Sequence, residues 1–198
     1  MTTQNYDFKQ IHEAYRPRIT RYLAGLAGDD NAEDLCQEVF LKVNKGLKDF
    51  RAEAKLSTWI YRIATNTYHD HVRGHTFRQQ QQEKLSPTEE IETIKGETPG
   101  LAEQPPIAEQ GVIRKEMIAC IRGYINQLPE EYRVVLLLSE EEGFKNREIA
   151  DILKISLDNA KIRLHRAKAK LKVILEGNCE FYLDDQSEVA CDRKKGCD

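Results

Sequence analysis

Apolar residues recur at three- and four-residue steps through most of the chain, which is the spacing of one face of an α-helix. From residue 8 to residue 26 this stripe predicts one helix that accommodates Pro17 with a bend and ends before Gly28. Asp30 or Asn31 is placed to cap a second helix with its own apolar stripe. The first part of the chain is therefore expected to be a bundle of amphipathic helices.

A third helix is expected after the N-cap residue Ser57, and its two faces differ. One face is apolar, while Trp59, Arg62, Asn66 and Arg73 follow one another at helical spacing on another face. A base can stack on an indole while cations and an amide bind phosphate or a base edge, so this stripe suits single-stranded nucleic acid. The alternative is a partly buried tryptophan with solvated neighbours.

The second helical part of the chain has the pattern of a helix-turn-helix. Residues 112–127 and 129–141 predict two amphipathic helices. A short helix capped by Asn146 and a long helix capped by Ser156 follow, joined by a tight turn at Lys154. Two helices joined in this way form the motif that places its second helix in the major groove of DNA.

The long helix has one apolar face, which must pack inward, and one basic face. Ile162 lies on the basic face, where an apolar side chain suits a thymine methyl better than water, and Asn159 and Arg166 are placed to reach base edges. Lysines on both sides, including Lys161 and Lys168, are expected to hold phosphates. The alternative is an ordinary basic surface that only solubilises the helix.

Charge and proline content divide the chain. The net charge is only −3, but residues 1–78 and 113–177 are mildly basic while residues 79–112 and 178–198 are acidic. The segment 79–112 begins with the four glutamines Gln79–Gln82 and holds four of the six prolines. It is predicted to be an extended linker between two small helical domains, followed by a cysteine-containing C-terminal tail.

Composition excludes several classes of protein. Hydrophobic residues make up 40% of the chain and charged residues 32%, and the longest aliphatic run, Val134–Leu138, is far too short to span a bilayer. Five cysteines without a C-x-x-C pair favour a reducing cytoplasm over a disulfide framework. No phosphate-binding glycine loop, nucleophile elbow or paired metal-ligand motif is present, so neither an enzyme nor a cofactor is expected.

Three stretches of the sequence resemble the extracytoplasmic-function (ECF) sigma factors, group IV of the bacterial primary-sigma family. They are AEDLCQEVF (Ala32–Phe40), FRAEAKLSTWIYRIATN (Phe50–Asn66) and the region Gln127–Leu171. The resemblance implies two all-α domains and a factor that recruits core RNA polymerase, reads the minus-thirty-five promoter element and melts the minus-ten element. It implies that the first domain binds the clamp of the largest polymerase subunit and the second domain binds the flap.

Residue by residue, the resemblance and the helical stripes together assign three groups of contacts. The expected polymerase-binding residues are Asp34, Gln37, Glu38 and Phe40. The expected single-strand contacts at the minus-ten element are Arg51, Lys55, Trp59, Arg62, Asn66 and Arg73. The expected minus-thirty-five contacts are Ser156, Asn159, Lys161, Ile162, Arg163, Arg166 and Lys168. The family also implies an anti-sigma partner, and it places the acidic linker near the RNA exit path.

The sequence departs from the family at two positions. Lys154 stands where the family usually has glycine, so a lysine is expected at positive φ at a cost of about 1 kcal/mol. Ile162 stands where the family usually has a small hydroxyl residue, which leaves the promoter sequence open.

Other features have competing interpretations. His69, His71 and His75 suggest a metal site, but surface histidines are preferred because only Asp70 lies nearby to complete a ligand set. The segments 180–183 and 188–191 are expected to pair as a small hairpin.

That hairpin would bring together Cys179, Cys191 and Cys197, for which plain reduced thiols are preferred over a zinc or redox site. For the whole chain, the competing function is a stand-alone helix-turn-helix transcriptional regulator.

Overall fold

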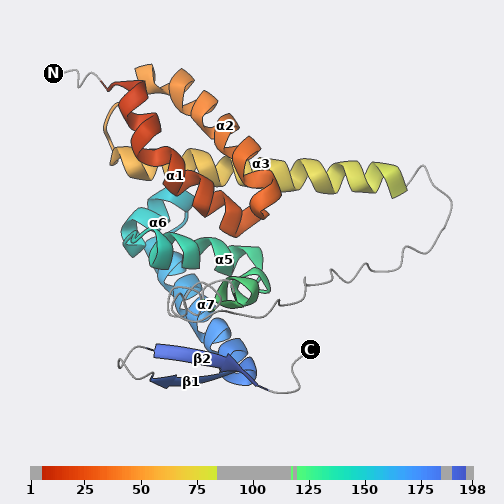
Figure 1. The fold of residues 1–198 in the computed structure, drawn as a ribbon. Coiled ribbons are helices and arrows are strands. Elements are labelled where there is room, and N and C mark those ends of the chain that lie inside the picture. The colour runs from red at the N-terminus through yellow and green to blue at the C-terminus, as the bar shows by residue number, and fades with distance from the viewer. Residues whose placement is uncertain (1–5, 84–116, 118–119, 184–188, 195–198) are drawn as a thin grey trace, which may run out of the picture.

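The computed structural model describes residues 6–83, 117, 120–183 and 189–194, with backbone alone for parts of the helix and strand ends. Two helical blocks lie side by side, and a two-stranded hairpin follows the last helix (Figure 1). This confirms the mostly helical, two-domain prediction. Apart from residues 79–83, the predicted linker lies outside the described residues.

The first block consists of α1 (Phe8–Ala27), α2 (Asp29–Gly46), the 3-10 turn η1 (Leu47–Asp49) and α3 (Leu56–Glu83). Gly28 separates α1 from α2 with φ +83°, a conformation that favours glycine. The side-chain amide of Asn31 donates to the Ala27 carbonyl at 3.1 Å. Asn31 therefore caps the end of α1, and the expectation that it or Asp30 caps the start of α2 is wrong.

The third helix is longer than expected at both ends. It begins at Leu56, so Ser57 lies inside it, and it continues through Gln79–Gln82 to Glu83. Glutamine has good helix propensity and no proline occurs before Pro87, so nothing in these residues ends the helix. Residues 79–83, which the sequence assigned to the linker, therefore belong to α3.

The second block contains a helix over residues 120–126, then α5 (Glu130–Leu136), the π-helical segment η2 (Leu137–Glu141), α6 (Asn146–Leu153) and α7 (Leu157–Asn178). The hydroxyl of Ser156 accepts from the Asn159 amide at 3.2 Å and caps α7 as expected.

The ends of α6 test two further expectations. The N-cap of α6 is Lys145, whose amide donates to the Glu148 side chain at 2.9 Å, so the expectation that Asn146 caps this helix is wrong. At the other end Lys154 has φ 54°, which confirms the predicted lysine at positive φ.

The C-terminal hairpin is confirmed. Strands β1 (Cys179–Leu183) and β2 (Val189–Arg193) pair antiparallel, with Phe181 opposite Cys191. These strands are the one departure from an all-α fold within the described residues.

A single apolar core joins the two blocks. The fully buried side chains include Tyr22 and Tyr61 from the first block and Leu137 and Ile149 from the second. A Cβ at Gly25 of α1 would lie 3.0 Å from a methyl group of Leu137, so the two backbones approach closely there. The helix-turn-helix is thus packed against the helical bundle through α6 and η2.

Candidate nucleic-acid interface

Trp59 is half-buried within the first block. Its indole packs on the ring of Phe50, with centroids 5.1 Å apart, and a Cβ at Gly46 would lie 3.0 Å from it. The tryptophan is therefore held in one place by α2 and by the residue that follows η1. This fixed position is compatible with both interpretations of the sequence, a ring on which a base stacks and a partly buried tryptophan with solvated neighbours.

Two of the cations predicted to contact the minus-ten strand contact the second block. The Arg62 Nε donates to the Asp151 carbonyl at 3.0 Å, and the Lys55 Nζ lies 2.8 Å from a carboxylate oxygen of Glu148. The hydrogen bond from Lys55, followed by that from the Lys145 amide, holds the pKa of Glu148 below its usual value. Oxygen atoms of α6 thus accept from the side chains of Lys55 and Arg62, which the sequence assigned to a DNA strand.

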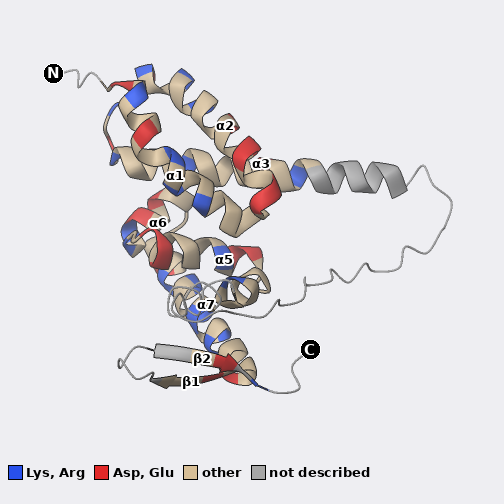
Figure 2. Ribbon diagram, in the orientation of Figure 1, with Lys and Arg blue, Asp and Glu red and all other residues tan. Residues whose placement is uncertain are grey.

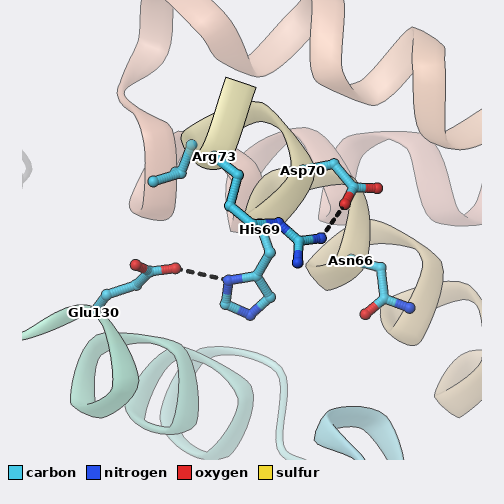
Figure 3. Close-up of a pocket in the computed structure, with 6 residues that line it drawn as sticks. Asn66, His69, Asp70, Arg73 and Glu130 are labelled. Carbon is cyan, nitrogen blue, oxygen red and sulfur yellow. Dashed lines mark hydrogen bonds and ion pairs between the residues drawn. The ribbon is translucent and has the colours of Figure 1, made fainter. Parts of the chain in front are cut away.

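The remaining stripe residues lie at a surface cavity of about 590 Å³ between α3 and the start of α5 (Figure 3). Asn66 and Arg73 line this cavity, and Arg73 pairs with Asp70. His69 Nδ1 lies 2.7 Å from a carboxylate oxygen of Glu130 across the cavity. Arg51 is exposed in the loop before α3, next to Ala52, whose φ of 55° is unusual for alanine. All six predicted residues lie on or beside the start and middle of α3.

The outward face of α7 carries some, but not all, of the predicted duplex contacts. Lys161, Ile162 and Arg166 are exposed, and Ile162 keeps 49% of its surface accessible. Arg163 instead donates from Nε to the Asn159 side chain at 3.1 Å and lies 3.6 Å from Glu131. These two residues hold each other on the helix, while the side-chain amide nitrogen of Asn159 is not engaged in this hydrogen bond.

Two further predicted residues have structural contacts. Lys168 forms an ion pair of 2.8 Å with Glu140 and, with a Ser139 hydrogen bond, lowers the pKa of that carboxyl. Ser156 is exposed, with its hydroxyl engaged in the α7 cap. Figure 2 colours the lysine and arginine positions of α7 blue.

Three of the four predicted polymerase-binding residues of α2 are exposed, and the fourth is buried. Asp34, Gln37 and Glu38 are exposed, but Phe40 keeps only 4% of its surface and packs edge-on against His12. Phe40 is a core residue because it continues the apolar stripe of α2. Leu41, on the same helix, is 61% exposed and was not predicted. Its position outside the apolar stripe of α2 could have indicated an exposed apolar residue.

The contact around Glu142 was also missed. This carboxylate follows η2 in the second block, yet its partners are Arg18, Arg21 and Tyr61 of the first block. Arg18 donates from Nε and from a terminal nitrogen at 3.1 and 2.9 Å, Arg21 lies at 3.5 Å, and Tyr61 donates its hydroxyl. Residues separated by more than eighty positions leave no spacing pattern in a sequence.

The structure describes only some of the histidines and cysteines that were considered as a metal or redox site. No group of histidine, cysteine and carboxylate residues in the described ranges is arranged to hold a metal ion. Burial first, and then the neighbouring Cys179 and Cys120, raise the pKa of the Cys191 thiol, while Cys197 and the side chain of His75 lie outside the described residues. Among the helices that the structure describes, none is long and apolar enough to cross a membrane.

The sequence matches two family models. Residues 11–78 match Sigma-70 region 2, and residues 118–171 match Sigma-70, region 4. The RNA polymerase sigma factor SigZ of Bacillus subtilis (strain 168) is 31% identical over 184 residues, which are 92% of this chain and 95% of SigZ. The ECF RNA polymerase sigma factor SigW of the same strain is 29% identical over 172 residues, 83% of this chain and 87% of SigW.

Two solved structures share the fold. The sigma factor RpoE of Bartonella quintana, in a co-crystal with the anti-sigma factor NepR, has a TM-score of 0.64 at 22% identity, covering 86% of this chain and 97% of that chain. CnrH, in complex with the cytosolic domain of CnrY, has a TM-score of 0.60 at 19% identity, covering 86% of this chain and 88% of that chain.

Proposed function

Because this chain belongs to the ECF sigma factors, the non-enzymatic subunits with sigma-70 regions 2 and 4 that bind RNA polymerase and DNA and direct transcription initiation, we propose specific roles for its two blocks. The first block grips the unpaired minus-ten strand through the α3 stripe. The second block reads the minus-thirty-five duplex through α7. Because residues 11–78 match Sigma-70 region 2, a stand-alone helix-turn-helix regulator does not account for the whole chain.

The observation that carries the minus-ten role is the composition of the stripe on α3. Trp59 is fixed against Phe50, while Arg62 and Asn66 follow it at helical spacing on the same side of α3. A fixed aromatic ring next to a guanidinium and an amide can hold an unstacked base and its phosphate. Arg51 and Lys55, just before α3, and Arg73, further along it, extend the positive surface.

The minus-thirty-five role rests on the cap and exposed face of α7. The Ser156 cap and the tight turn at Lys154 hold α7 at a fixed angle to α6, as a helix-turn-helix requires. Lys161 and Arg166 are accessible for phosphate or base contacts, and Ile162 presents an apolar surface between them. Asn159, Arg163 and Lys168 complete the proposed set; in the structure Arg163 binds Asn159, and Lys168 pairs with Glu140.

The partners follow from the same assignment. Asp34, Gln37 and Glu38 form an exposed polar face on α2 for the clamp of the largest polymerase subunit, and the second block binds the flap. An anti-sigma factor is a further proposed partner, supported by the similar structure of RpoE, which was solved with the anti-sigma factor NepR. A role on RNA polymerase implies action in the cytoplasm, and the proposal includes no cofactor.

Run-off transcription with core polymerase on a promoter library tests the minus-ten role. The variant Trp59→Ala, Arg62→Ala, Asn66→Ala should bind core polymerase normally but fail to open promoters, which permanganate reactivity of unpaired thymines reports. Glu13→Ala, on an exposed position of α1, is the matched control and should open them normally. Normal opening by the triple variant would refute the proposed strand contact.

A further inference from the structure

The C-terminal hairpin is attached to the last turn of α7. Strand β1 begins where α7 ends, and the Cys179 amide donates to the Leu175 carbonyl of that turn. Directly after β2, Lys194 donates from its amide to the Asn178 carbonyl at 3.0 Å and from Nζ to the Glu176 carbonyl at 2.6 Å. Figure 1 shows both strands beside this end of α7. The start and the end of the hairpin therefore both bind carbonyl groups that a helix end leaves without helical partners.

Two cysteine side chains lie on one face of this hairpin. Cys191 of β2 lies opposite Phe181, which is two positions after Cys179 in β1. Because residues two positions apart share a face of a strand, and opposite residues share a face of the sheet, Cys179 and Cys191 are diagonal neighbours. Neither forms a disulfide in the structure; Cys179 is 3% exposed and Cys191 is half-buried.

The two thiols also interact with each other. Burial is the largest cause of the raised pKa of Cys191, followed by the neighbouring thiols of Cys179 and Cys120 and a hydrogen bond with Cys179. A disulfide needs a closer approach of the two Cβ atoms than diagonal neighbours usually have. A hairpin of two strands is held by no further strand of a sheet, so a small shift of β2 supplies that approach.

We propose that Cys179 and Cys191 form a redox-sensitive dithiol, which hydrogen peroxide converts into a disulfide that locks the hairpin onto the end of α7. Disulfides inside cells are typically transient and sense redox changes. The dithiol lies beyond residues 118–171, which match region 4. This modification site is therefore separate from the promoter contacts proposed above, and it does not depend on them.

The oxidation balances with one molecule of hydrogen peroxide. Cys191, the more accessible thiol, loses its proton, and its sulfur attacks one peroxide oxygen; the O–O bond breaks, and the other oxygen leaves with that proton as water. The Cys179 sulfur, losing its own proton, then attacks the sulfenic sulfur of Cys191, and the S–O bond breaks to release a second water. Because the thiolate is the nucleophile, the raised pKa of Cys191 makes the first step slow, so the dithiol responds to sustained exposure.

The disulfide would hold the hairpin closed. A hairpin of two strands is only marginally stable alone, so the reduced hairpin can open and release Lys194 from the end of α7. A bond between Cys179 and Cys191 removes most of these open conformations, because it closes a short loop. Lys194, three positions after Cys191, is then kept close to the Glu176 and Asn178 carbonyls.

The site is tested by treating the full chain with hydrogen peroxide, alkylating the remaining thiols and digesting with trypsin. No lysine or arginine lies between Val173 and Arg193, so both cysteines stay in one tryptic peptide. We expect this peptide to become lighter by two hydrogen atoms and to resist alkylation until dithiothreitol is added. Cys191→Ser should leave Cys179 open to alkylation, whereas the matched control Cys120→Ser should form the disulfide normally.

Several products would overturn the assignment. A link from the peptide 173–193 to the peptide that carries Cys120, or to Cys197 outside the described residues, would show a different pairing. A sulfinic acid at Cys191 without any link would show that Cys179 does not resolve the first product. Neither outcome depends on a variant that folds, because both are read from the parent chain.

Hydrogen exchange of the Lys194 amide, followed by NMR, tests the lock. This amide donates to the Asn178 carbonyl, so it exchanges only when the hairpin opens there. Oxidation should slow its exchange by about tenfold or more, and dithiothreitol should reverse the change. Cys191→Ser treated with peroxide should exchange as the reduced parent chain does. Equal exchange rates in the oxidised and reduced parent chain would overturn the lock.

Discussion

Lys55 and Glu148 lie 2.8 Å apart, Nζ to Oε1, although ninety-three positions of sequence separate them. The other oxygen of Glu148 accepts the Lys145 amide at 2.9 Å and so caps α6. One carboxylate therefore stabilises the first turn of the helix-turn-helix and also binds the first block. Its titration reports whether the two blocks are together.

The pKa of Glu148 should rise when Lys55 is replaced by alanine, because the hydrogen bond from Lys55 is the largest cause of its lowered value. A depressed native pKa stabilises the fold at pH values above the pKa of the unfolded chain, and this contribution disappears as the pH falls through the native pKa. Carboxyl carbon chemical shifts during an NMR titration measure the change. Lys48→Ala, on an exposed position away from α6, should leave the titration of Glu148 unchanged. If the pKa of Glu148 is also unchanged in Lys55→Ala, the two residues do not form this contact in solution.

Lys154→Gly should stabilise the protein, because Lys154 holds φ 54° at the end of α6. Glycine removes the strain of a residue with a side chain in the left-handed backbone conformation, which adds about 1–2 kcal/mol to the free energy of unfolding. The greater conformational freedom of glycine in the unfolded chain offsets roughly half a kcal/mol of that gain. The net gain of about 1 kcal/mol is measurable by urea denaturation. Lys161→Gly, inside α7, should lose about 1 kcal/mol, and equal effects from both changes would contradict the backbone argument.

Local pattern predicted the helices, the N-cap of α7 and the turn of the helix-turn-helix, and the C-terminal hairpin. Ser156 as N-cap and Lys154 at positive φ follow from rules that act within a few residues. The errors were local too: Asn31 caps the preceding helix, and Gln79–Gln82 continue α3 because nothing stops it. Several caps compete for one helix end, and the sequence alone does not rank them.

The arrangement of the two blocks could not be predicted from the sequence. Glu142 appeared as one acid in a run of three, and only the fold brings Arg18, Arg21 and Tyr61 to it. Helical spacing placed Trp59, Arg62 and Asn66 on one side of α3, but the contact of Arg62 with α6 depends on long-range packing. Phe40 illustrates the reverse case, since its periodicity already marked it as core.

Phe40→Ala should act on stability and not directly on polymerase binding. Truncating a buried phenylalanine costs about 3–5 kcal/mol, and Phe40 packs against Phe8 and His12 in the core. Gln37→Ala, exposed on the same helix, should leave the denaturation midpoint unchanged and weaken binding to core polymerase. Urea denaturation and surface plasmon resonance separate the two effects. A stable Phe40→Ala protein that has lost polymerase affinity would restore the contact originally predicted for Phe40.

Ile162 should make the minus-thirty-five preference sensitive to a single methyl group. It is half-exposed on the outward face of α7 between Lys161 and Arg166, where a thymine methyl can cover it. Replacing that thymine by uracil removes one methyl, which is worth about 0.8 kcal/mol or roughly a fourfold loss of holoenzyme affinity. Uracil scanning of a selected promoter would locate the base, and Ile162→Ala should lose the sensitivity at that position while keeping its response at others. If every uracil substitution is neutral for the parent chain, Ile162 does not contact a thymine.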